Sequence, residues 1–332
     1  MTPQQILSVF LLFEDAKGTS SFWYPYLKIL PTIFNTPAFY SEEELQLLPK
    51  GMYILAKEQS GKILSAYKDL YSFYEVLKAK YPELIISDHL SYERFQWAWY
   101  AVNTRCVYME QPEKEHGNFV MAPFLDLLNH SPTVQTEAVF DPYINCYNIK
   151  TETHFKRWQQ VFICYGSLGN DKLLLDYGFV VSNNQHSTVT FDTDDIVHCF
   201  DEIQDCEAES LHNKKLQIIQ SKSLQSNLFC GVDGLSWCLS TALKIMCMDS
   251  DEIKTWSSVY LSSGISTSCE KRAIDLTVKL LKRELNCNQI TLKKIEEATV
   301  QLKTAVHLNI IQRFTQERLQ IIEHALREFI MT

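Results

Sequence analysis

The spacing of apolar residues changes twice along this chain of 332 residues, and the change limits the possible folds more than any other feature. Up to about residue 108, apolar positions recur every three or four residues, which is typical of amphipathic helices. Between 119 and 192 they form short runs bounded by turn residues, which is typical of strands. After about 195 the helical spacing returns. The pattern predicts an α+β protein that is helical at both ends.

The amino end predicts a helix over residues 3–16. Thr2 is a suitable N-cap, Pro3 fits the first helical position, and Gln5 stands where a reciprocal capping bond forms. This start signal favours a helix over a secretory signal peptide, since the apolar run has no basic segment before it and is followed by Glu14 and Asp15.

The other predicted elements follow from the same periodicities. A stripe with spacings of 4, 3, 4 and 3 lies within residues 52–80 and is formed by Ile63, Tyr67, Leu70, Tyr74 and Leu77. Further helices are predicted over 91–108, 211–221, 237–248 and 290–330. Strands are predicted at 138–140, 147–149, 161–165, 179–181 and 188–191.

Charge and cysteine content exclude several classes of protein. The net charge of −9 argues against a chain that binds nucleic acid directly, because phosphate binding needs a basic face. The ten cysteines form no Cys-x-x-Cys pair, so the sequence predicts reduced thiols and no metal site. No apolar run reaches 18 residues, so no membrane span is predicted. The composition therefore indicates a protein of the cytosol or the nucleus.

Three clusters place polar groups inside apolar sequence, where each group needs a partner or a ligand. They are residues 103–108 (Asn-Thr-Arg-Cys-Val-Tyr), residues 126–131 (Asp-Leu-Leu-Asn-His-Ser), and residues 163–166 (Ile-Cys-Tyr-Gly) with 174–179 (Leu-Leu-Asp-Tyr-Gly-Phe). Each cluster alone has a structural interpretation as a turn, a strand end or an internal ion pair. Their order along the chain favours a shared site.

In that order the clusters resemble SET-domain protein lysine methyltransferases. Asn129-His130-Ser131 is similar to the Asn-His-Ser motif of the family, 161–166 to its strand ending in Tyr-Gly, and 175–180 to its closing segment. The branch that the chain resembles is typified by the Rubisco large-subunit methyltransferase. The resemblance implies a β-rich SET fold over 1–195 with a helical insertion at about 41–118. It also implies an all-α, substrate-binding-like lobe over 196–332.

The resemblance also implies roles for named residues. Tyr177 matches the catalytic tyrosine, and Asn129, His130 and Arg105 match positions that bind the cofactor, S-adenosylmethionine. The family pattern places Tyr165 and Phe179 in the wall of the lysine channel, and Thr104 and Asp126 near the substrate peptide. The Cys-rich zinc cluster of some histone-directed families is missing, so no metal is expected.

Family members begin with strands and a Gly-x-Gly loop that wraps the cofactor, whereas the first glycine here is Gly18. The resemblance is therefore to a SET domain without its amino-terminal strands. Two functions follow. The first is methyl transfer from S-adenosylmethionine to a lysine of a histone or non-histone protein. The second is a catalytically impaired form that acts as a protein-binding module.

Overall fold

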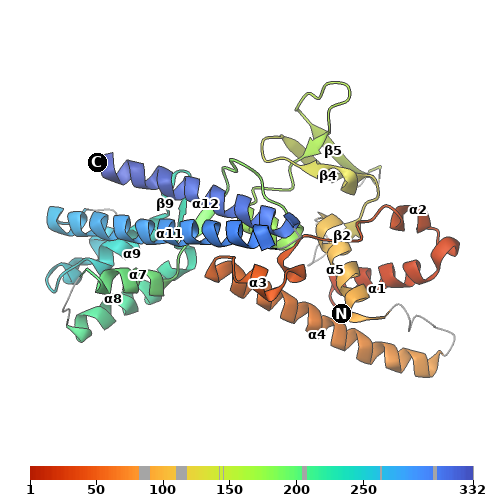
Figure 1. The fold of residues 1–332 in the computed structure, drawn as a ribbon, viewed down its shortest axis with the longest axis horizontal. Coiled ribbons are helices and arrows are strands. Elements are labelled where there is room, and N and C mark those ends of the chain that lie inside the picture. The colour runs from red at the N-terminus through yellow and green to blue at the C-terminus, as the bar shows by residue number, and fades with distance from the viewer. Residues whose placement is uncertain are drawn as a thin grey trace. The chain divides into compact units, whose positions relative to one another are not determined.

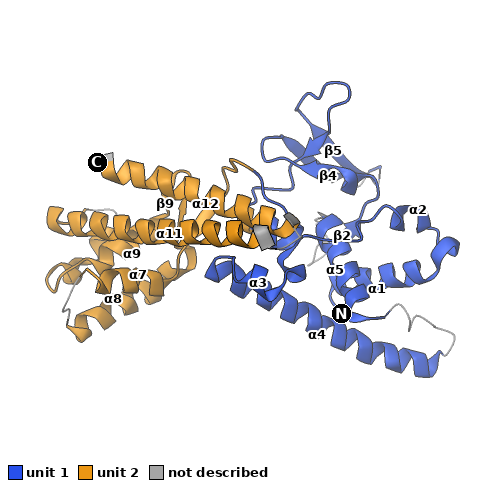
Figure 2. Ribbon diagram, viewed as in Figure 1, with its two compact units in different colours: residues 1–168, 172–181 blue, residues 169–171, 182–332 orange. Residues whose placement is uncertain are grey.

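The computed structural model describes residues 1–81, 90–109, 118–141, 143–144, 146–203, 208–261, 264–301 and 305–331. The chain divides into two compact units, residues 1–168 with 172–181 and residues 169–171 with 182–332 (Figure 2). The sequence predicts a boundary between 195 and 196, and the difference has a simple cause. Strand β7 (Thr188–Thr190) pairs with β8 (Phe229–Gly231) of the second unit, so the chain before it already belongs to that unit.

Helices form most of the amino-terminal part of the first unit. α1 (Pro3–Ala16) begins with the predicted capping box: the Thr2 hydroxyl accepts from the Gln5 N–H at 3.2 Å, and the Gln5 side chain accepts from the Thr2 N–H at 2.7 Å. The elements that follow are η1 (Gly18–Ser20), α2 (Tyr24–Leu27), η2 (Pro37–Phe39), α3 (Glu42–Leu45), α4 (Lys50–Lys80) and α5 (Tyr92–Arg105).

The predicted stripe of α4 faces the core of the first unit. Ile63, Leu70 and Tyr74 are buried in one cluster with Leu12 of α1 and Phe95 of α5. The other two stripe residues are partly buried. Since burial of each large apolar side chain is worth about 1.5–3 kcal/mol, this cluster fixes α1, α4 and α5 to one another.

α5 is shorter than the helix predicted over 91–108. It ends at Arg105, and β1 (Cys106–Met109) pairs antiparallel with β2 (Asn118–Met121). The residues after Arg105 are of types that suit a strand, and β2 supplies the hydrogen-bond partners that the helix would otherwise supply. In the described part of the predicted helical insertion over 41–118, α3, α4 and α5 are helical, and the strand β1 follows α5 directly.

Short strand pairs make up the middle of the first unit. β4 (Thr136–Asp141) pairs antiparallel with β5 (Cys146–Thr151), and β3 (Asn129–His130) pairs parallel with β6 (Phe162–Ile163). β4 and β5 confirm the strands predicted at 138–140 and 147–149, and β6 is shorter than the strand predicted at 161–165. The run at 179–181 forms no strand in the described part of the chain, because no described segment pairs with it.

The second unit is mainly helical, as predicted, with one small antiparallel sheet in the order β7-β8-β9. α11 and α12 lie side by side (Figure 1), and α11 begins well before the helical segment predicted from residue 290. No helix among the described residues is long and apolar enough to cross a membrane. The elements of this unit are α7 (Thr193–Asp201), α8 (Glu209–Ser221), η6 (Leu224–Asn227), β9 (Gly234–Leu235), α9 (Trp237–Met246), η7 (Glu252–Thr255), α10 (Ser257–Tyr260), α11 (Thr267–Gln301) and α12 (Ala305–Met331).

Candidate active site

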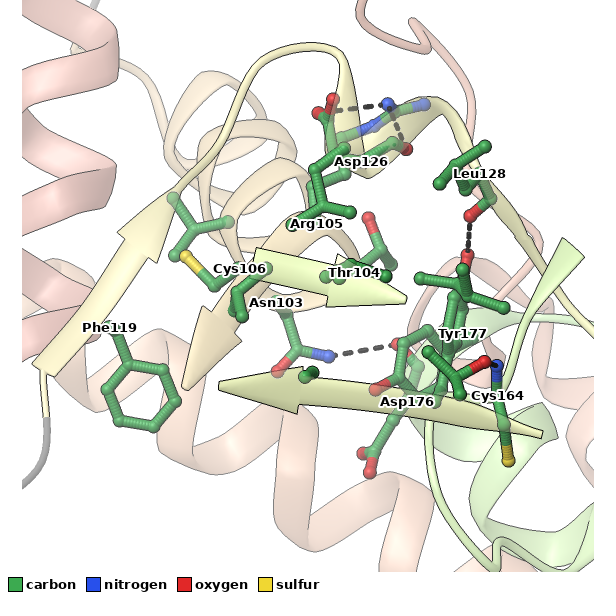
Figure 3. Close-up of a pocket in the computed structure, with 18 of the residues that line it drawn as sticks. Asn103, Thr104, Arg105, Cys106, Phe119, Asp126, Leu128, Cys164, Asp176 and Tyr177 are labelled. Carbon is green, nitrogen blue, oxygen red and sulfur yellow. Dashed lines mark hydrogen bonds and ion pairs between the residues drawn. The ribbon is translucent and has the colours of Figure 1, made fainter. Parts of the chain in front are cut away.

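A cavity of about 420 Å³ lies in the first unit, where the three polar clusters of the sequence meet (Figure 3). The first cluster contributes the end of α5, and the second contributes η4 (Leu125–Leu127). The third contributes the segment after β6 and η5 (Leu173–Tyr177), a π-helical turn that follows the short α6 (Asn170–Lys172). Single π-helical turns occur frequently at functional sites. The predicted site residues in the cavity wall are Thr104, Arg105, Asp126, Tyr165 and Tyr177.

Tyr177 is one of four rings that lie close together. The ring centroid of Tyr177 lies 5.4 Å from that of Tyr165 and 6.1 Å from that of Phe179. The His130 ring lies 5.1 Å from Tyr165 and 6.2 Å from Phe179. The Tyr165 hydroxyl donates to the main-chain carbonyl of Leu128 at 2.6 Å. By contrast, the Tyr177 hydroxyl makes no hydrogen bond with any residue that the structure describes, and it is therefore available to a ligand in the cavity.

Burial keeps both tyrosines of the wall protonated. It raises the pKa of Tyr165 to about 12, with a further contribution from Tyr177. Burial, followed by the neighbouring Asp176 carboxylate, also raises the pKa of Tyr177. At neutral pH each phenol is therefore a neutral donor and acceptor and not a base.

Gly178 allows the chain to turn directly after Tyr177. Its φ is +80°, and a Cβ built there would lie 2.6 Å from the carbonyl carbon of Asn35 and 2.7 Å from the nitrogen of Thr36. Both contacts are with main chain that cannot rotate away. Glycine after Tyr177 in the closing segment is thus required by the backbone at this position.

Arg105 and Asp126 form a buried pair in the cavity wall. Arg105 Nη1 donates to Asp126 Oδ2 at 3.2 Å and to the Asp126 carbonyl at 3.1 Å. The Tyr26 hydroxyl donates to the same Oδ2 at 2.5 Å, and the Asp126 side chain is fully buried. Two polar atoms of the pair, Arg105 Nε and Asp126 Oδ1, are buried and have no hydrogen-bond partner among the described residues. One donor and one acceptor thus remain for a ligand.

Two predicted cofactor residues lie apart from this pair. His130 is buried, and its Nδ1 accepts from the Tyr165 N–H at 3.0 Å. Asn129 is exposed and is not part of the described cavity wall. Phe179 also lies outside the wall, and its ring packs against that of Tyr177. The roles of Asn129 and His130 toward the cofactor stay predictions.

Several residues of the site were not predicted from the sequence. Tyr26 lies 100 residues before Asp126, and nothing in the sequence connects them. Asn103 lies in the first polar cluster and donates to the main-chain carbonyl of Asp176 at 2.9 Å. Gln4 of α1 also lines the cavity. Asn103 could have been found, because it directly precedes Thr104 and Arg105 inside the first cluster.

Solved structures define the class of fold. The chain superimposes on the SET domain of LSMT bound to lysine and AdoHcy with a TM-score of 0.60, 98% of this chain and 74% of that chain being covered. Only 19% of the aligned residues are identical. The likeness therefore shows a SET fold with a helical lobe.

Sequence comparisons define the family. The model for Rubisco LSMT substrate-binding matches residues 207–324. SET domain-containing protein 4 of Mus musculus is 34% identical over 331 residues, covering 97% of this chain and 74% of the relative. The Homo sapiens protein of that name is 32% identical over 327 residues, covering 97% and 73%. The chain belongs to the SET-domain protein-lysine methyltransferases, in the branch that includes Rubisco LSMT and SET domain-containing protein 4.

This family uses S-adenosylmethionine as methyl donor, which assigns that cofactor to the chain. The residues present fit it. The cofactor carries an α-carboxylate and an α-ammonium, and the wall offers the buried Nε of Arg105 and Oδ1 of Asp126, which have no partner among the described residues. A guanidinium binds carboxylates well because its donors are planar and permanently charged.

Proposed function

We propose that this chain transfers a methyl group from S-adenosylmethionine to the side-chain amine of a lysine in a protein substrate. The observation that carries the proposal is the Tyr177 hydroxyl, which lies in the wall of a cavity among three other rings and makes no hydrogen bond with the described residues. When bound, S-adenosylmethionine supplies an electrophilic methyl group, and a carbon–nitrogen bond to lysine forms as the carbon–sulfur bond breaks.

The residues of the wall prepare the amine for this step. The rings of Tyr165 and Tyr177 line the methyl-transfer position with apolar surface, Phe179 packs against Tyr177, and such surface lowers the pKa of a lysine by disfavouring its charged form. The Tyr177 oxygen can accept an N–H bond from the neutral amine and so direct its lone pair. Holding donor and acceptor in line supplies several kcal/mol of the barrier reduction.

Arg105 and Asp126 orient the ligands around that position. Their Nε and Oδ1, which have no hydrogen-bond partner among the described residues, are suited to the amino-acid end of the cofactor or to the substrate main chain. Thr104 donates its hydroxyl to the Tyr100 carbonyl at 2.7 Å and keeps only acceptor capacity for a substrate peptide.

The substrate is a histone or a non-histone protein, and the net charge of −9 favours a basic target. The reaction belongs to the cytosol or nucleus, since the described cysteines are free thiols, which suits a reducing compartment. Incubation of the chain with radiolabelled S-adenosylmethionine and a cell extract, followed by mass spectrometry of the labelled bands, would identify the substrate and the methylated residue.

Tyr177→Phe tests the role of the hydroxyl. We expect kcat to fall about tenfold or more while the Kd for S-adenosylmethionine, measured by calorimetry, stays the same, because a contact made in the transition state is lost. Tyr143→Phe is the matched control, since Tyr143 is 96% exposed and lies outside the described cavity wall. Unchanged turnover of Tyr177→Phe would refute this role. If the unaltered chain shows no heat of binding with S-adenosylmethionine and transfers no methyl group, the proposed function is refuted, and the protein-binding module is the function that remains.

A further inference from the structure

A side-chain amide holds the main chain directly before Tyr177. Asn103 of α5 donates through Nδ2 to the Asp176 carbonyl at 2.9 Å (Figure 3). Gln4 of α1 donates through Nε2 to the Asn103 Oδ1 at 3.3 Å. Because the amide oxygen of Asn103 accepts from Gln4, its NH₂ end is the one that faces Asp176.

Both peptide groups that flank Tyr177 are therefore hydrogen-bonded. The preceding group accepts from Asn103 through the Asp176 carbonyl. The following group donates from Gly178 to the carbonyls of Leu173 and Leu174 at 3.0 and 3.1 Å. The orientations of these two peptide planes determine φ and ψ of Tyr177, and these set the direction in which its side chain leaves the backbone.

The other bonds of the turn do not replace this contact. The Asp176 carboxylate accepts from Gln59 at 3.1 Å and pairs with Lys172 at 2.6 Å. Those contacts hold the Asp176 side chain, whose χ angles can change without moving the peptide group. In the part of the chain that the structure describes, Asn103 is the side chain bonded to the Asp176 carbonyl.

We propose that Asn103 is a positioning residue for methyl transfer: through the Asp176 carbonyl it sets the direction of the Tyr177 hydroxyl, and Gln4 supports it by fixing the orientation of its amide. The inference rests on the proposed function, in which that hydroxyl acts on the lysine amine. It deepens that function by assigning positioning roles to one residue of α1 and one residue of α5.

Two substitutions of Asn103 separate positioning from simple packing. Asn103→Ala removes the donor, and we expect kcat to fall about fivefold. Asn103→Asp is of equal size but places a carboxylate oxygen against the Asp176 carbonyl oxygen, so we expect a fall of about tenfold or more. In both variants the KM for the protein substrate and the calorimetric Kd for S-adenosylmethionine should change less than about twofold.

Gln96→Ala is the matched control. Gln96 lies on the same helix and also donates a side-chain amide to a main-chain carbonyl, that of Ala38 at 3.3 Å. It lies outside the described cavity wall, so its loss should leave kcat unchanged. Gln4→Leu provides a second variant if Asn103 variants do not fold. We expect kcat to fall about twofold to threefold, with no further loss when it is combined with Asn103→Ala.

The outcomes distinguish the two proposals. An active unaltered chain whose Asn103→Asp variant equals Asn103→Ala, or in which only the cofactor Kd changes, overturns the positioning role. If neither Asn103 variant folds, an unchanged kcat in Gln4→Leu overturns it instead. An unaltered chain that transfers no methyl group overturns the proposed function, and this inference with it.

Discussion

Each unit of the molecule buries a charged side chain completely, and the two are treated differently. In the second unit, Lys215 donates from Nζ to the Met246 carbonyl at 2.7 Å, and the same atom lies 4.8 Å from the centroid of the Phe200 ring. In the first unit, Asp126 uses one carboxylate oxygen for Tyr26 and Arg105, and its other oxygen has no partner among the described residues.

Place relative to a cavity and unused hydrogen-bonding capacity distinguish a buried charge with a structural role from one with a functional role. The Lys215 ammonium is held within the core of its unit and lies in none of the described cavities. Asp126 lies in a cavity wall and keeps unused acceptor capacity, which costs free energy in the absence of a ligand. We therefore expect Lys215 to serve stability and the Asp126 network to serve binding.

Substitution of Lys215 should have the largest effect on stability. Lys215→Ala removes a buried stem and leaves the Met246 carbonyl without its donor, so we expect the free energy of unfolding to fall by about 3 kcal/mol. Lys215→Met keeps most of the volume and should cost less, since apolar replacement of a buried charge is tolerated. Urea denaturation followed by circular dichroism measures both. Weaker binding of S-adenosylmethionine by folded Lys215→Ala would contradict the expectation that Lys215 serves stability and not binding.

Removal of the Tyr26 hydroxyl should lower stability less than loss of Lys215 and should weaken ligand binding instead. Tyr26→Phe keeps the ring but frees Asp126 Oδ2 from one donor, so the pair with Arg105 shifts. We expect about threefold to tenfold weaker binding of S-adenosylmethionine or peptide, with a stability loss of about 1 kcal/mol. Calorimetry and denaturation on one sample measure the two. Tyr24→Phe on the same short helix is the control, and equal behaviour of the two variants would show that Asp126 does not act through Tyr26.

The dependence on pH should show the smallest effect. Both site phenols have raised pKa values, that of Tyr165 being about 12, so both ionise at a higher pH than an ordinary tyrosine. Stability from the buried neutral phenols is fully present below about pH 10, the value in the unfolded chain, and is lost as pH rises toward 12. We expect kcat/KM to rise up to about pH 10 as the substrate amine loses its proton. A fall between pH 8 and 10 would contradict this.

The sequence predicted much of the local structure correctly. The capping box at Thr2 and Gln5 and the buried stripe of α4 depend on residues that are close in sequence, and both are confirmed. The helix predicted to run to residue 108 ends at Arg105. The prediction was wrong because aromatic and β-branched residues continue past Arg105. These residues form a strand because they pair with β2, and β2 is too far along the chain to enter a comparison of neighbouring positions.

In the site, too, some features could be predicted from the sequence and others depend on contacts between distant residues. The family resemblance predicted that Arg105, Asp126, Tyr165 and Tyr177 lie around the cofactor and the substrate, and the structure brings these four residues into one cavity wall. The bond between Asn103 and Asp176 joins residues 73 positions apart, and the bond between Tyr26 and Asp126 joins residues 100 positions apart. Neither pair follows a period or a motif, so the sequence could not reveal them.

The helical character of both ends, most of the short strands and the family could be predicted from the sequence, since these depend on local periodicity and on motif order. Only the tertiary structure decided which polar atoms in the wall have partners. That depends on how α1 packs on α5, α5 on η5 and α2 on η4, because a hydrogen bond forms only where packing brings donor and acceptor within about 3 Å. The Tyr177 hydroxyl and the Asp126 Oδ1, which have no hydrogen-bond partner among the described residues, are products of that packing.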